Sequence, residues 1–265
     1  MAADTLRRNA SEQESTSAAA TGTTVATGLT VCSEPRVSTS SLYTRIRSDE
    51  DKNNDGMTID KVVGSDGIER YVVYLDGTGG AGDVWNAGNR LSAYANGYKI
   101  LGINDPYITE RMSKIPSGAE VMLVGYSQGG IDAQNIAASG KFNVTDVVTF
   151  GSPKVPNSDP ASRGVNVLQL EAYFDLVPRS DAVAAHPARI VRSALFDAAA
   201  GALDPNRGTT EHFFGVGEGR NPGEIHEDQA SYESVGRQFD NSTDPRFDTI
   251  RQSMARYHGT VTRQD

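Results

Sequence analysis

A serine lies between two glycines in the run Gly125-Tyr126-Ser127-Gln128-Gly129, which matches the pattern Gly-x-Ser-x-Gly. The residues before it, 121–124, are all apolar, which is typical of a strand buried on both faces. The run 131–138 after it predicts a helix. A strand, a sharp turn and a helix form a nucleophile elbow, in which flanking glycines let the two backbones approach. Ser127 is therefore our predicted nucleophile.

A serine nucleophile needs an imidazole base that a carboxylate orients. On folds with this elbow, the acid and then the histidine follow the serine, each after a later strand. Asp175 fits the acid position, because it ends the strand-like run 167–174 and precedes Leu176-Val177-Pro178, where the chain turns away. Asp181 is the alternative acid, although it lies farther into the loop.

The base must be one of four histidines: His186, His212, His226 and His258. We favour His226, which follows the Gly/Pro-rich loop 221–225 and precedes a predicted helix over 227–239. His186 and His212 remain open alternatives. His258 follows the last predicted helix near a polar terminus, so we expect it to be exposed to solvent.

An acyl-transfer site also needs donors for the oxyanion. The amide of Gln128, next to the nucleophile, is one candidate. Thr78 is the other, since Asp76-Gly77-Thr78-Gly79-Gly80 follows the strand-like run 71–75. This loop also satisfies Gly-x-Gly-x-x-Gly, but Asp76 precedes the first glycine and no second strand ending in an acid follows at the required distance, which argues against a dinucleotide.

No cofactor or metal is expected. The run 51–56, Asp-Lys-Asn-Asn-Asp-Gly, begins like a calcium loop. The twelfth position of that loop is Val62 rather than the glutamate that would bind the ion through both oxygens. A turn before a strand is the better interpretation.

From Leu42 onward, strand-like runs alternate with helical runs, which predicts a mostly parallel sheet with helices on both faces. A hairpin is expected from 57–63 and 70–75, joined by Gly64-Ser65-Asp66-Gly67. Further strands are predicted at 144–150, 165–173 and 188–196, and further helices at 84–96, 105–114 and 244–257.

The length of 265 residues suits one α/β domain, which we place at 41–265 after a flexible segment, 1–40, rich in Ala, Ser, Thr and Glu. The net charge of −9 argues against nucleic acid or an anionic membrane as a partner. Cys32 is the only cysteine, so no intramolecular disulfide can form. No apolar run is long enough to span a membrane, and residues 1–8 lack the apolar core of a secretory signal, which leaves other export routes open.

The elbow resembles that of cutinases and PE-PPE-type mycobacterial esterases. The runs 148–153, Val-Thr-Phe-Gly-Ser-Pro, and 175–178, Asp-Leu-Val-Pro, resemble those of cutinases and class 3 lipases. The resemblance implies an α/β-hydrolase fold and a serine esterase or lipase, with Ser127 as nucleophile and Asp175 as acid. Cutinases place the base soon after the acid, which would favour His186, whereas the longer spacing of the lipases favours His226.

The expected reaction is hydrolysis of carboxylic esters, of lipids or other acyl groups, by Ser127, His226 and Asp175, with Thr78 and Gln128 at the oxyanion. An acyltransferase could use the same residues with an acceptor other than water. A non-catalytic module that binds lipid or protein on the same fold is the third hypothesis.

Overall fold

The computed structural model describes residues 37–48, 56–78, 99–156, 158–179, 204 and 206–264. The predicted helix at 84–96 and the predicted strand at 188–196 lie outside these residues. So do Asp181, His186, the run 51–55 and all but the last part of the segment 1–40.

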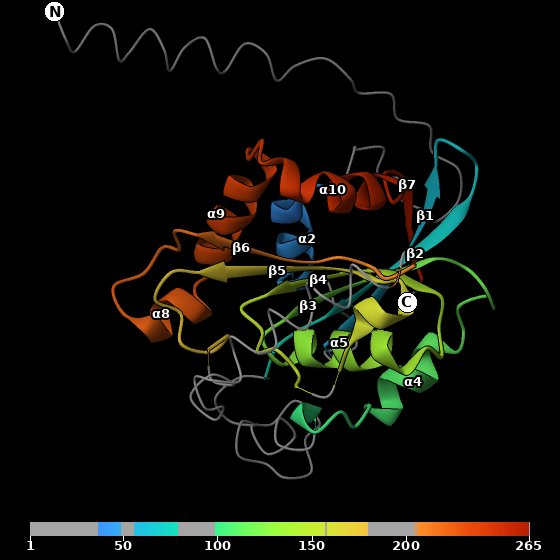
Figure 1. The fold of residues 1–265 in the computed structure, drawn as a ribbon, viewed down its shortest axis with the longest axis horizontal. Coiled ribbons are helices and arrows are strands. Elements are labelled where there is room, and N and C mark those ends of the chain that lie inside the picture. The colour runs from blue at the N-terminus through green and yellow to red at the C-terminus, as the bar shows by residue number, and fades with distance from the viewer. Residues whose placement is uncertain are drawn as a thin grey trace, which may run out of the picture. The chain divides into compact units, whose positions relative to one another are not determined.

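The described residues form a seven-stranded sheet in the order β6-β5-β4-β3-β2-β1-β7 (Figure 1). Strands β2 to β6 are parallel, whereas β1 is antiparallel to β2 and β7 is antiparallel to β1. The strands are β1 (Met57–Gly64), β2 (Glu69–Leu75), β3 (Val121–Tyr126), β4 (Val144–Phe150), β5 (Asn166–Ala172), β6 (Thr210–Gly215) and β7 (Gly259–Arg263). The prediction of a mostly parallel sheet with helices is confirmed, and so is the β1–β2 hairpin.

Helices cover both faces of this sheet (Figure 1). On one face lie α2 (Thr39–Ile46), α9 (Gln229–Asp240) and α10 (Asp248–Ala255), and on the other lie α4 (Pro106–Met112) and α5 (Gln128–Ser139). The remaining described helices are α8 (Pro222–Glu227) and the short 3₁₀ turns η1 (Pro160–Arg163) and η2 (Pro245–Phe247).

The central strands are buried on both faces, as their apolar runs predict. In β3, Met122 and Val124 pack in the core beneath α2 and α9, while Val121 and Leu123 pack in the core beneath α5. All six residues of β3 are buried. This strand therefore holds the residue that follows it, Ser127, at a fixed place at the end of the sheet.

Several predicted boundaries need correction. The helix expected over 244–257 is two elements, η2 and α10, because Pro245 follows Asp244, whose side chain accepts from the Arg246 amide and begins a separate turn. Strands β6 and β7 were not predicted at all. Both are edge strands whose side chains are mostly half-buried, so neither has the continuous apolar run of a central strand.

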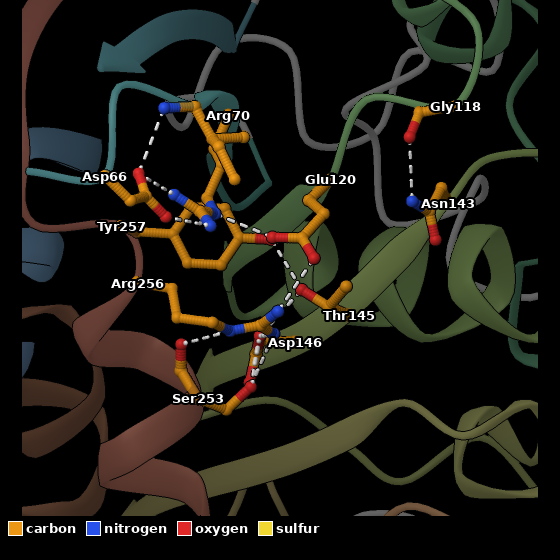
Figure 2. Close-up of polar contacts among 11 residues, drawn as sticks. Asp66, Arg70, Gly118, Glu120, Asn143, Thr145, Asp146, Ser253, Arg256 and Tyr257 are labelled. Carbon is orange, nitrogen blue, oxygen red and sulfur yellow. Dashed lines mark hydrogen bonds and ion pairs between the residues drawn. The ribbon is translucent and has the colours of Figure 1, made fainter. Parts of the chain in front are cut away.

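A network of charged side chains ties the N-terminal ends of the strands together (Figure 2). Arg70, only 4% exposed, bonds Asp66 at 2.8 Å and Glu120 at 2.6 Å. Arg256 then bonds Glu120 at 2.8 Å and Asp146 at 3.5 Å. The network joins the β1–β2 turn, β4, the start of β3 and the end of α10. It lies at the N-terminal ends of the parallel strands, and Ser127 lies at their C-terminal ends.

Candidate active site

Ser127 occupies the sharp turn between β3 and α5. Its backbone has φ 51° and ψ −117°, a strained conformation for a residue with a side chain, and its amide donates to the carbonyl of Phe150 at 2.9 Å. A Cβ on Gly125 would lie 2.5 Å from the backbone of Gly129, and a Cβ on Gly129 would lie 2.1 Å from the carbonyl oxygen of Leu75. The two glycines of the motif are therefore required by close backbone contacts.

The structure brings the three predicted triad residues together. Nε2 of His226 lies 3.0 Å from Oγ of Ser127, although these residues are 99 positions apart. Nδ1 of His226 lies 2.7 Å from Oδ2 of Asp175. Because a carboxylate oxygen can only accept, it favours the imidazole tautomer with the proton on Nδ1, and Nε2 can then accept from the serine hydroxyl.

Asp175 follows β5 and is completely buried. Its Oδ1 accepts from the amide of Val177 at 2.9 Å, and its Oδ2 accepts from the hydroxyl of Tyr232 at 2.5 Å in addition to His226. The residue before it, Phe174, has φ 70°, so the chain turns sharply as it leaves the strand. Three donors therefore compensate the buried charge of the carboxylate and fix its orientation.

His226 lies in α8, not in a loop before a longer helix as predicted. Asn221 caps this helix by accepting from the Glu224 amide, and Pro222 is at its first position, which together start a helix where the sequence indicated an irregular segment. The next helix, α9, begins only at Gln229, after Asp228 has ended α8 and capped α9.

Tyr126, the residue before the nucleophile, holds the base in place. Its ring stacks on the His226 ring at 5.1 Å between centroids, and its hydroxyl donates to the backbone carbonyl of His226 at 2.5 Å. Burial raises the pKa of Tyr126 well above its usual value, so the hydroxyl keeps its proton and remains a donor. The same holds for Tyr232, whose pKa is raised by burial and by the nearby charge of Asp175.

The structure separates the other described histidines from Ser127. His212 is a residue of β6, and its Nδ1 lies 3.2 Å from Oε1 of Glu171 on β5. His258 lies in the exposed turn before β7. His186 is outside the described residues.

The two predicted oxyanion residues belong to the helix that follows the nucleophile and to the segment after β2. Gln128 is the first residue of α5, so its amide belongs to the positive end of that helix. In the segment after β2, a Cβ on Gly77 would lie 3.1 Å from Cβ of Ser127, which places the start of the loop with Thr78 against the serine. That the amides of Thr78 and Gln128 bind an oxyanion stays a prediction.

Sequence reasoning missed two residues of this site. Tyr232 on α9 gave no signal, because its contact with Asp175 depends on how α9 packs over the sheet. Arg47, which ends α2, places its guanidinium over the ring of Tyr126 at 5.2 Å and bonds Asp76 at 3.1 Å. Arg47 lies close to the segment that was interpreted as flexible, so nothing in the pattern linked it to the elbow.

Among the described residues, no group of three or more His, Cys, Asp or Glu side chains is arranged to hold a metal ion. None of the described helices combines the length and the apolar character needed to cross a membrane. Comparison of the chain with protein-family models, curated proteins and solved structures gave no match.

Proposed function

We propose that this chain is a serine hydrolase of the α/β-hydrolase type that cleaves carboxylic esters. The observation that carries the proposal is the continuous chain of contacts from Ser127 Oγ to His226 Nε2, at 3.0 Å, and from His226 Nδ1 to Asp175 Oδ2, at 2.7 Å. Each of the three side chains follows a different part of the sheet, in the order serine, acid and histidine that this fold uses. A partly exposed serine in contact with a histidine that a buried aspartate orients is the arrangement that activates a serine nucleophile.

In the first half of the reaction, Oγ of Ser127 attacks the carbonyl carbon of the ester while Nε2 of His226 takes its proton. Asp175 stabilises the imidazolium that forms. The tetrahedral intermediate then collapses: its bond to the alcohol oxygen breaks, His226 returns the proton to that oxygen, and the alcohol leaves an acyl-serine.

In the second half, water takes the place of the alcohol. His226 removes a proton from the water molecule while that water attacks the acyl-serine. His226 then gives the proton to Oγ of Ser127 as the carboxylic acid product departs. The negative charge of both tetrahedral intermediates would be stabilised by the amides of Thr78 and Gln128.

The surface around Asp175 favours an ester with an apolar acyl or alcohol group. Phe174 is 73% exposed and Leu176 is 60% exposed, on either side of the buried acid. Tyr173 and Phe214 stack on each other nearby and are also exposed. Large apolar side chains grouped on a surface are typical of contact with apolar ligands.

Covalent labelling with a fluorophosphonate probe, located by intact mass and peptide mapping, tests the proposal. We expect one adduct, on Ser127, that is lost in Ser127→Ala and in His226→Ala. His212→Ala and His186→Ala serve as matched controls and should label at the wild-type rate, with the fold of each variant checked by circular dichroism. A folded wild-type protein that takes no adduct would overturn the proposal, and an adduct lost only in His186→Ala would overturn the role of His226.

A further inference from the structure

Two parts of the site that lie far apart in the sequence are held by one side chain, Arg47, at the end of α2. Its Nη1 donates to Oδ1 of Asp76 at 3.1 Å, and its guanidinium lies over the ring of Tyr126, 5.2 Å from the centroid. Only about a third of the Arg47 side chain is exposed. A partly desolvated guanidinium with a carboxylate on one side and an aromatic face on the other is a well-ordered group.

The contact with Asp76 reaches the loop that contains Thr78. Oδ1 of Asp76, which accepts from Arg47, also accepts from the backbone amide of Gly77 at 2.7 Å. Gly77 in turn lies against Ser127, since a Cβ at Gly77 would be 3.1 Å from the serine Cβ. Arg47 therefore restrains, through one carboxylate oxygen, the backbone that enters the predicted oxyanion loop.

The contact with Tyr126 reaches the base. The Tyr126 ring contacts both the guanidinium of Arg47 and the imidazole of His226, on which it stacks. The Tyr126 hydroxyl also donates to the His226 carbonyl. A shift of the Tyr126 ring would therefore move His226 relative to Ser127.

We propose that Arg47 is a positioning residue, which holds the oxyanion loop and the histidine base in their positions relative to Ser127. This inference rests on the proposed hydrolase function. Arginine is suited to the task because its planar group can pair with a carboxylate at the edge and stack on a ring with its face, whereas the ammonium of lysine is a compact point charge that cannot do both.

The chain contains a matched control on the same helix. Arg45 pairs with Asp60 at 3.2 Å and lies over the ring of Tyr74 at 5.4 Å, so it makes the same two kinds of contact. Asp60 belongs to β1, away from Ser127. Arg45→Met therefore removes an ion pair and a stacking contact of the same kinds, with the ion pair more buried than that of Arg47, without touching the site.

The experiment measures kcat and KM for p-nitrophenyl butyrate, together with urea unfolding, for the wild type, Arg47→Met, Arg47→Lys and Arg45→Met. We expect Arg47→Met to lower kcat by about tenfold to a hundredfold with little change in KM, since a small misplacement of reacting groups has effects of this size. Arg45→Met should keep kcat within about twofold even where its loss of stability is equal. Arg47→Lys should recover only part of kcat.

Equal values of kcat for Arg45→Met and Arg47→Met, whether both normal or both reduced, would overturn the role of Arg47. Should Arg47→Met not fold, Asp76→Asn tests the same link from the other side, and a wild-type kcat in that variant would equally overturn it. A wild-type protein that neither hydrolyses the ester nor reacts with the fluorophosphonate would instead overturn the proposed function.

Discussion

The hydroxyl of Tyr232 donates to Oδ2 of Asp175, the same carboxylate oxygen that faces Nδ1 of His226. One carboxylate oxygen of Asp175 therefore accepts hydrogen bonds from both the base and a buried phenol. The phenol stabilises part of the negative charge that faces His226. The orientation of the acid and the charge at the base both depend on a residue of α9.

Tyr232→Phe should therefore lower kcat/KM by about tenfold to a hundredfold, because Asp175 loses a donor that fixes its orientation, and a small misplacement of catalytic groups has effects of this size. Steady-state kinetics with an ester substrate measure this loss.

Tyr257→Phe is the control for this variant. Tyr257 is also buried, and its hydroxyl hydrogen-bonds Oγ1 of Thr145 at 2.5 Å, in the network at the N-terminal ends of the strands (Figure 2). Its kcat/KM should stay within about twofold of the wild-type value. A wild-type kcat/KM in Tyr232→Phe, or the same loss in both variants, would contradict the role of the phenol.

The strained backbone of Ser127 predicts an unusual order of stabilities among its variants. Ser127→Gly should unfold at a higher urea concentration than Ser127→Ala, because glycine adopts φ 51° with less strain, which is worth about 1–3 kcal/mol against a cost of about 0.5–1 kcal/mol for its greater freedom when unfolded. Urea unfolding of the two inactive variants measures the difference. An alanine variant as stable as the glycine variant would show that the turn stores no strain.

Lys99 makes a buried ion pair with α5, the helix that begins at the elbow. Its Nζ lies 2.6 Å from Oδ2 of Asp132 and 3.6 Å from Oδ2 of Asp105, and its side chain has no exposed surface. Lys99→Met would leave two buried carboxylates without this cation, which should lower the free energy of unfolding by about 3–5 kcal/mol. Lys61→Met, which breaks a pair with the exposed Glu69, should leave urea unfolding unchanged, and a similar loss in both variants would contradict the argument.

The network at the N-terminal ends of the strands predicts a dependence of stability on acid. The hydrogen bonds that Asp66 accepts from Arg70 lower the pKa of Asp66 from 3.8 to about 2. A carboxyl whose pKa is lower in the folded protein stabilises the fold above its unfolded pKa, and that contribution is lost as the pH falls through the folded pKa. The destabilisation caused by Asp66→Asn should therefore shrink as the pH falls from about 4 to about 2. Urea unfolding at several pH values measures this difference, and a constant difference would contradict it.

The elbow and the β1–β2 hairpin could be predicted from sequence because their signals are local. The glycines of the motif, the apolar run of β3 and the turn at Gly64-Ser65-Asp66-Gly67 each lie within a few residues of the structure they specify. Asp175 could be predicted for the same reason, as the residue at which a strand-like run ends.

The remaining features depend on contacts between distant segments. His226 and Ser127 are 99 residues apart, and only the packing of α8 against β3 distinguishes this histidine from the other described histidines, His212 and His258. β7 is a short edge strand that contains Gly259, Thr260 and Thr262, so it has no apolar run from which a strand could be predicted. Arg47 and Tyr232 come from helices on one face of the sheet, and neither lies near the motif they contact.

The pairing of β7 with β1 has a consequence for how the molecule folds and opens. Asp60 pairs with Arg263, so this edge of the sheet joins segments from near the two ends of the described chain, and such non-local pairings form late. A short, half-buried edge strand is also among the first elements to open, which amide hydrogen exchange would detect as weak protection. When β7 opens, β1 becomes the edge, and its unpaired backbone groups can accept a strand from another molecule. Resistance to aggregation therefore depends on β7 more than on the tightly packed core beneath Ser127.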